Sequence, residues 1–303
     1  MKPFLRSCFS ADRRLLLAGV GAVVAVAGTA RAAGQDPSSA TRAVIAAMRA
    51  RARPAVVLEQ AEGPTVCRLG GYPRLPAASD WPDRKGRPLS FIAELDLAAL
   101  RAAGGPDWLP ASGALHLFFD VEDEPWGFDP ADRDGWKVIM TSAASPRPLP
   151  RPPGLSGDRV FASIALAGRL AQTYPTTERL DLPPDVGRTF EFEPVQDFMD
   201  SGLGDGPRHQ VSGYPSPIQG DGMELEAQLA SNGIYVGGPE GYSDERVAAL
   251  EAGAGDWRLL LQIDSDDAAG MMWSDSGTLY VWVREQDARL GDFSGVWIVL
   301  QSA

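Results

Sequence analysis

Two pairs of polar residues stand where two strands are expected to end, and they are the strongest candidates for chemistry. Glu94 and Asp96 flank Leu95, so both carboxylates leave the same face of a strand. Gln262 and Asp264 occupy the matching positions of a second, similar stretch. Paired carboxylates can hold a cation or act as general acid and base. The alternative is that these side chains cap loops and form turns where the strands end.

The second half of the chain repeats the first in blocks that keep their order. Gly71-Tyr72-Pro73 returns as Gly213-Tyr214-Pro215, residues 91–96 return as 260–264, and 113–119 return as 277–283. We expect two copies of one supersecondary unit. If the copies pack about a pseudo-twofold axis, the two polar pairs, together with Tyr72 and Tyr214, converge on one groove.

The chain has two histidines, too few for a multi-histidine metal site. His116 lies in an apolar strand pattern, and we expect it to serve the structure. His209 stands beside the second glycine-tyrosine-proline turn and Gln219, where it could act as a general base or a hydrogen-bond donor. The alternative, which the sequence favours, is that His209 fixes this loop through hydrogen bonds.

Two acidic loops, at 120–135 and 264–275, raise the question of calcium. Neither has the spacing of an EF-hand, because Ala268 and Ala269 occupy positions that should be acidic and glycine. We therefore expect solvated loops and predict no cofactor, with calcium as the one candidate ion.

Standard catalytic signatures are absent from the sequence. It contains no His-Glu-x-x-His helix, no Gly-x-Ser-x-Gly elbow and no phosphate-binding loop. Cys67 is expected to be a buried thiol. Trp126, Trp136 and Trp273 fall in expected loops, where they could form a contact surface or close the core of each half.

Short strands and short helices alternate irregularly along the chain. Apolar patterns predict strands near 56–58, 91–95, 115–121, 190–192, 259–263, 278–283 and 296–300. They predict helices near 41–53, 97–102, 160–170, 224–229 and 244–252. Without a regular βαβ order, this pattern favours an α+β fold, pseudo-duplicated, with a mixed or largely antiparallel sheet.

Residues 1–32 have the order of a signal peptide: basic residues, an apolar stretch and a small-residue cleavage site at Ala32. The apolar stretch is short for a membrane span, which disfavours an uncleaved anchor. Arg13-Arg14 favours twin-arginine export, and ordinary Sec export is the alternative. We expect a periplasmic or secreted protein without a stable membrane anchor.

The remaining chain divides into a tether with a short helix and one large domain. The tether and helix cover 33–60, and the domain covers 61–303. Two repeat-like halves, at about 61–144 and 208–301, are joined by a connector that is rich in proline at 145–153.

The net charge of the chain restricts the classes of partner that it is expected to bind. The net charge is −12, and cleavage after Ala32 leaves 23 basic and 39 acidic residues, a net of −16. Such a surface repels phosphate backbones and anionic lipid, so we expect neither nucleic acid nor membrane as a partner. A basic protein suits this surface.

The ordered blocks resemble the YwqG-like proteins over nearly all of the chain from Arg68 onward. The resemblance rests on 69–73 with Trp81-Pro82, 88–97, 113–119, 209–215 with Gln219, and 277–283 followed by Phe293, Trp297, Leu300 and Gln301. It implies an α+β fold, an unknown function and no established catalytic residues. Ser212 departs from the family pattern, which has glycine there, and export departs from the mostly cytoplasmic members.

These observations favour a non-enzymatic, protein-binding module of the cell envelope. An immunity-type protein that neutralises a periplasmic toxin is a specific version of this hypothesis. The alternative is a hydrolase of envelope glycan or peptide that uses Glu94, Asp96 or Asp264, with His209 as a further candidate.

Overall fold

Alternating apolar residues build one large antiparallel sheet. The computed structural model describes residues 37–60, 62–76, 78–142 and 147–303, and the expected signal peptide at 1–32 lies outside them. Ten strands join in the order β12-β11-β10-β9-β1-β8-β2-β5-β6-β7, and β3 and β4 form a separate hairpin. The strands are β1 (Arg53–Glu59), β2 (Thr65–Leu69), β3 (Asp83–Arg84), β4 (Arg87–Pro88), β5 (Ser90–Asp96), β6 (Ala114–Phe119), β7 (Trp136–Thr141), β8 (Ile164–Thr173), β9 (His209–Val211), β10 (Trp257–Asp264), β11 (Thr278–Arg284) and β12 (Trp297–Gln301).

Seven α-helices accompany the sheet in the described residues. They are α1 (Ser39–Ala50), α2 (Leu97–Ala102), α3 (Pro184–Thr189), α4 (Phe192–Asp200), α5 (Met223–Ser231), α6 (Val247–Leu250) and α7 (Glu285–Arg289). The first begins at Ser39, two residues before the expected start near 41, and its N-cap is Ser38, whose side chain accepts from the backbone N–H of Thr41 at 3.2 Å. This α+β architecture with its antiparallel sheet confirms the predicted fold class.

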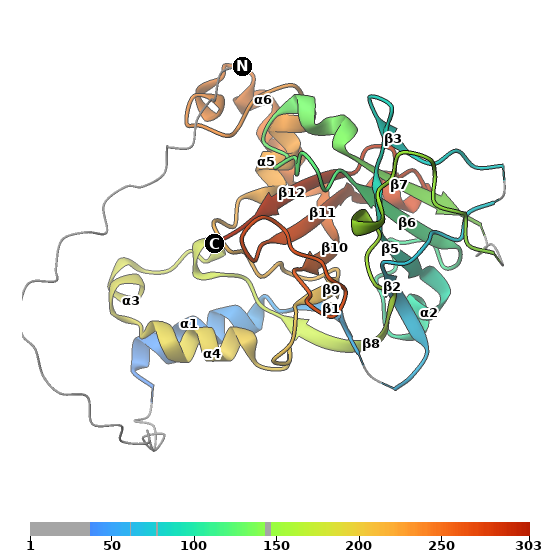
Figure 1. Ribbon diagram of the computed structural model, residues 1–303. Helices are drawn as coiled ribbons and strands as arrows, with labels where there is room; N and C mark the ends of the chain where they lie inside the picture. The colour runs from blue at the N-terminus through green and yellow to red at the C-terminus, as the bar shows by residue number, and fades with distance from the viewer. Residues whose placement is uncertain (1–36, 61, 77, 143–146) are drawn as a thin grey trace, which may run out of the picture. The chain divides into compact units, whose positions relative to one another are not determined.

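The order of the strands in the sheet reflects the sequence repeat (Figure 1). The sheet contains two repeated units, and the first strand of each unit pairs with the second strand of the other. One flank of the sheet holds β2, β5, β6 and β7, and the other holds β9, β10, β11 and β12. Between them, β1 precedes β2 in the chain but pairs with β9, while β8 precedes β9 but pairs with β2. We call β1, β2, β5, β6 and β7 the first unit, and β8, β9, β10, β11 and β12 the second unit.

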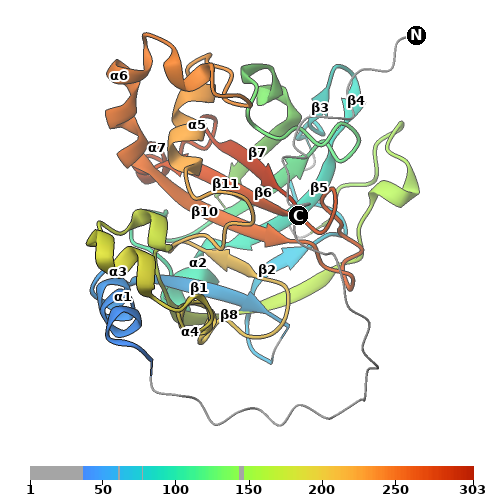
Figure 2. The ribbon, with the colours of Figure 1, turned by 90° about the vertical axis from the view of Figure 1, so that its left-hand side faces the viewer.

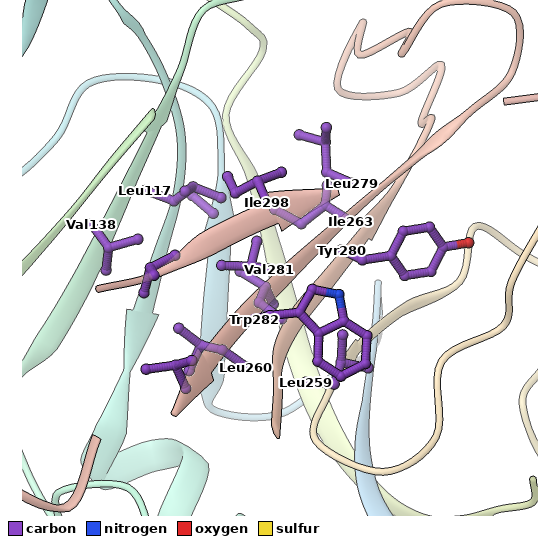
Figure 3. Close-up of a cluster of buried hydrophobic side chains, with 14 of the residues drawn as sticks. Leu117, Val138, Leu259, Leu260, Ile263, Leu279, Tyr280, Val281, Trp282 and Ile298 are labelled. Atoms are coloured by element: carbon purple, nitrogen blue, oxygen red, sulfur yellow. The ribbon is translucent and has the colours of Figure 1, made fainter. Parts of the chain in front are cut away.

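The inner faces of the two flanks pack against each other. Figure 3 shows Leu117 and Val138 of the first unit near Val281 and Leu260 of the second, and these four side chains line one small apolar void. Fully burying such a side chain stabilises the fold by about 1.5–3 kcal/mol. The two units thus share one core.

The tryptophans divide between the core and the surface. Trp136 packs edge-on against Trp297 at 5.1 Å between ring centroids, and its indole N–H donates to the carbonyl of Val296. Trp273 is fully buried, whereas Trp126 is 36% exposed. Trp136, expected in a loop, begins strand β7, and it closes the core together with Trp273, whereas Trp126 reaches solvent.

A separate helical layer packs on one end of the sheet. Helices α1, α3 and α4 lie together in Figures 1 and 2, around a small apolar cluster that includes Val44, Met48, Leu180 and Val195. Residues 174–208, which contain α3 and α4, connect β8 to β9, whereas 60–64 suffice to connect β1 to β2. This insertion breaks the pseudo-twofold symmetry of the two units.

Three local predictions are wrong. Residues 160–170, expected as a helix, enter strand β8, because β1 and β2 each need a hydrogen-bonded neighbour on that side. Of residues 190–192, expected as a strand, the first two join α3 to α4 and Phe192 begins α4. The helix expected over 244–252 is confined to α6 and continues as a 3₁₀ turn over 251–256, where Gly253 and Gly255 weaken the α-helix.

Candidate functional site

Matching turns follow β2 and β9, and matching side chains hold them. Arg68 donates to the carbonyls of Gly70 and Tyr72, at 2.5 and 2.9 Å. Gln210 donates to the carbonyls two and four residues further on, those of Ser212 and Tyr214, at 2.9 and 2.8 Å. The two glycine-tyrosine-proline blocks are therefore structurally equivalent.

In the first unit, a buried carboxylate binds two arginines. Glu94 is 3% exposed and accepts from Arg68 at 3.0 Å and from Arg74 Nε at 2.9 Å. Burial alone would raise the pKa of Glu94, but the hydrogen bond from Arg74 and the charges of both arginines outweigh it and lower the pKa. Glu94 is consequently ionised, paired and screened from solvent.

His116 completes this polar cluster. Its ring lies 3.5 Å from Glu94 and 3.1 Å from the Thr141 hydroxyl, and its side chain is fully buried. Burial lowers the pKa of His116 to about 4, so the ring is neutral at pH 7. His116 is therefore a neutral, buried member of this polar cluster.

Asp96 lies at the start of a helix. Its carboxylate accepts from the backbone N–H groups of Ala98 and Ala99, both at 2.9 Å, and so caps the N-terminus of α2. This contact corresponds to the turn-forming alternative in the sequence pattern.

In the second unit, neutral groups replace the charged cluster. Gln262 takes the place of Glu94, and its carbonyl oxygen accepts from the backbone N–H of Ser216 at 3.0 Å. Ser216 itself stands where the first unit has Arg74, one residue after the proline of the turn. The guanidinium of Arg74 therefore has no counterpart in the second unit.

The Asp264 carboxylate is held by neutral hydrogen-bond donors. Its carboxylate accepts from the backbone N–H of Arg208 at 2.9 Å, from the Thr278 hydroxyl at 2.8 Å and from the N–H of Ser265 at 3.0 Å. The guanidinium of Arg208 turns instead to Asp200. Among the ion pairs of the described residues, none includes Asp264.

A pocket of about 400 Å³ opens beside these residues. One wall comes from the second-unit turn and the ends of β10 and β11, and the other comes from α4 and the end of β8. Its lining comprises Thr173, Tyr174, Thr176, Gln196, Met199, Asp200, Leu203, Arg208, Tyr214, Pro215, Ser216, Pro217, Ile218, Gln262, Asp264, Ser276 and Thr278. The insertion that carries α4 thus builds a pocket over the second unit.

Three of the sequence-predicted site residues meet here, and the others do not. Tyr214, Gln262 and Asp264 line the pocket. Glu94 and Asp96 belong to the first unit, so the structure does not bring both polar pairs to this pocket. Tyr72 is 39% exposed in the first unit.

The Tyr214 ring is held from two sides. The guanidinium carbon of Arg53 lies 4.3 Å from its centroid, and that of Arg179 lies 5.6 Å away. Gln219 lies nearby in sequence, but its side chain donates to the carbonyl of Ser302 at 3.0 Å. Gln219 therefore fastens the turn to the C-terminus and does not line the pocket.

His209 is committed to internal hydrogen bonds. Its Nδ1 accepts from the backbone N–H of Asp264 at 3.1 Å, so its Nε2–H donates to Asp266 at 3.1 Å. The residue is 2% exposed, and burial lowers its pKa although Asp266 opposes the shift. Both ring nitrogens are occupied, which leaves no lone pair for a general base.

The sequence as a whole matches one family model. The model describes a domain of unknown function, DUF1963, and covers residues 67–302. The chain belongs to the DUF1963 family. No curated protein matches it.

All pocket residues fall within the DUF1963 domain, whereas α1, β1 and the first two residues of β2 precede it. No helix in the described ranges is both long and apolar enough to cross a membrane. A second pocket of about 450 Å³ lies along strand β7 at the edge of the sheet, and no sequence-predicted site residue lines it.

The acidic loops of the DUF1963 domain are tied to basic groups and backbone. Asp120 pairs with Arg84 and Arg87, at 3.1 and 2.6 Å. Asp266 accepts from His209 and from two backbone N–H groups. In the part of the chain that the structure describes, no three metal-ligating side chains gather as a cation would require.

Cys67, at the start of the DUF1963 domain, is fully buried. Burial raises the pKa of its thiol to about 12, so it remains protonated at neutral pH.

Sequence reasoning missed Ser216, Arg208 and Asp200. Ser216 carried a usable signal, because Gly71-Tyr72-Pro73-Arg74 aligns with Gly213-Tyr214-Pro215-Ser216. Arg208 and Asp200 carried none, since they belong to the insertion that has no counterpart in the first unit.

Proposed function

We propose that the chain is an exported, YwqG-like, non-enzymatic binding module of the cell envelope, and that the pocket of the second unit receives a basic segment of another protein. Export rests on the order of residues 1–32, and the basic partner rests on the acidic composition. An immunity-type role toward a basic toxin is one version of this proposal.

One observation carries the binding role. The pocket is preformed, and the groups around it that could react are already engaged: His209 through both nitrogens and Asp264 through three donors. Such a site can recognise a ligand by shape and charge, and the nearby His209 has no ring nitrogen left to act as a base.

The hydrolase alternative receives no specific support from the geometry. It needs two carboxylates in one accessible cleft, at the separation that acid–base chemistry requires. Glu94 is buried in ion pairs and Asp96 caps a helix. Asp264 shares the pocket with Asp200, whose carboxylate is paired with Arg208.

Photo-crosslinking tests the binding role. A photoreactive residue replaces Ile218, which lines the pocket and is 39% exposed; as a control, the same residue replaces Leu290, which is 84% exposed and lies outside the pocket. We expect one envelope protein to crosslink stoichiometrically at 218 and not at 290. Equal crosslinking at both sites, or none at 218 under export conditions, contradicts the proposal.

A further inference from the structure

The first unit indicates what fits the pocket of the second. Near the end of strand β5, the guanidinium of Arg74, a residue of the same unit, donates hydrogen bonds to Glu94. The hydrogen bond that Arg74 donates to Glu94 is the largest cause that raises the pKa of Arg74, and the charge of Asp96 adds to it. The guanidinium thus lies against the buried carboxylate of the first polar pair.

The second unit keeps the turn and the strand ends around this position, with neutral Gln262 in place of Glu94, but lacks the arginine. Ser216 replaces Arg74, and the space beside Gln262 and Asp264 belongs to the pocket. The backbone N–H of Ser216 satisfies Gln262, so the turn keeps its position without the arginine. The pocket is therefore the counterpart of an arginine site from which the arginine is missing.

The electrostatics agree with this view. Asp264 is held by two backbone N–H groups and a hydroxyl, none of which neutralises its charge. Asp200 adds a second carboxylate to the lining, and Arg208, its partner, is the single basic residue among the lining residues. Asp264 is half-buried and lies in no ion pair of the described residues, and such a carboxylate favours a planar, charged hydrogen-bond donor.

We propose that the second-unit pocket binds an arginine side chain of the partner protein, near the position that Arg74 occupies in the first unit. This inference rests on the proposed function and names the residue type that the pocket recognises. Residues of α4 and the second-unit turn form the walls around the guanidinium, and Asp264 pairs with it.

Calorimetry with three short peptides tests the inference. The probes are N-acetylated, C-amidated Gly-Arg-Gly and its lysine and citrulline analogues. We expect the arginine peptide to bind at least tenfold more tightly than the citrulline peptide, and more tightly than the lysine peptide or free arginine. The preference over citrulline should shrink as salt rises, because the charges are partly solvent-exposed. Equal affinity for arginine and citrulline, or for arginine and lysine, overturns the proposal.

Two variants locate the binding. Ser216→Arg places a guanidinium where the first unit has one and should abolish peptide binding. Ser276→Asp adds a carboxylate at the exposed rim, at a left-handed backbone position that aspartate tolerates, and should tighten binding several-fold. Asp267→Asn, exposed and outside the pocket, is the control for net charge and should change little. Unchanged affinity in both pocket variants overturns the proposal.

The two proposals fail in different ways. If a partner crosslinks at Ile218 but the arginine and citrulline peptides bind equally, the binding module stands and the arginine preference falls. If the arginine peptide binds but crosslinking at 218 matches that at 290, the preference of the pocket for arginine is supported. The proposal that the pocket receives a protein partner is then contradicted.

Discussion

At the scale of single residues, the two turns share one backbone conformation but have different residue types at an equivalent position. Gly70 and Ser212 occupy equivalent positions with φ of 59° and 64°, in the left-handed region. A side chain at Gly70 would collide with the carbonyl of Ala162, whereas the second unit has room for Ser212. The departure from the family pattern at Ser212 is thus tolerated at the cost of backbone strain.

Exchanging these two residue types gives a matched pair of variants. Ser212→Gly should stabilise the protein by about 0.5–1 kcal/mol, because glycine relieves the left-handed strain. Gly70→Ser should destabilise it by more than ~2 kcal/mol, through strain and the steric clash. Chemical denaturation measures both changes. Similar destabilisation by both variants would contradict the equivalence of the turns.

Glu226 on α5 supplies a prediction about pH. Burial, and then the charges of Glu224 and Asp221, raise its pKa to about 7, and one carboxylate oxygen is buried without a hydrogen-bond partner in the described residues. Because the folded-state pKa lies above the unfolded value, its contribution to stability is full below about pH 4 and is lost as pH rises towards 7.

Replacing Glu226 with glutamine removes this loss. Glu226→Gln should stabilise the protein at pH 8 by about 1–3 kcal/mol and have little effect at pH 4. Thermal melts across this range provide the measurement, and Glu240→Gln, on the exposed surface, is the control. A variant whose stabilisation does not depend on pH would contradict the assignment.

At the scale of elements, Glu94 joins β5 to β2 and to the turn that follows β2. It lies opposite Arg68 in the β2–β5 register and binds both Arg68 and Arg74. The equivalent β9–β10 pair, Gln210 and Gln262, fixes its turn with neutral hydrogen bonds. The strands and their turn are thus connected by ion pairs in the first unit and by neutral hydrogen bonds in the second.

Glu94→Gln should destabilise the protein by about 3 kcal/mol at pH 7, because Arg68 stays partly buried without its carboxylate. The lowered pKa of Glu94 means that its stabilisation is present above the unfolded value of about 4.3 and is lost as pH falls below it. The variant should therefore approach the wild type in strong acid. Glu59→Gln breaks an exposed ion pair with Arg169 and should cost less than about 1 kcal/mol. Equal costs would contradict the account.

The sequence predicted those elements whose apolar alternation is strong. Strands β5, β10 and β11 were expected near their observed positions, and so was helix α5. Strand β8 was taken for a helix, because its alanines and leucines suit either state and only β1 and β2 decide between them. Strand β7 was missed, and so was β2.

The candidate site was predictable only where the repeat marks it. Comparison of the units pointed to Gln262, Asp264 and Tyr214, which do line one pocket. The sequence pattern of one strand could not reveal that Arg74 donates to Glu94, because this hydrogen bond joins a turn to a strand. The α4 wall comes from an insertion without a repeat pattern.

At the scale of the whole molecule, strand exchange makes each unit depend on the other. Strand β1 pairs with β8 and β9, and β2 pairs with β8 as well as β5. The inner faces of both units also share one core. Neither unit can complete its sheet alone.

Splitting the chain tests this dependence. Fragments 37–156 and 157–303 should each lack a cooperative thermal transition and should regain one when mixed. Circular dichroism of the separate and mixed fragments provides the measurement. A cooperative transition in either fragment alone would contradict the strand exchange.

The central claim is that the second unit keeps open the arginine site that the first unit fills from within. A crystal structure of the Ser216→Arg variant tests it most directly. The account predicts that the introduced guanidinium enters the pocket and lies within hydrogen-bond distance of the Asp264 carboxylate, as Arg74 lies against Glu94. A guanidinium that points into solvent and leaves the pocket open would contradict the claim.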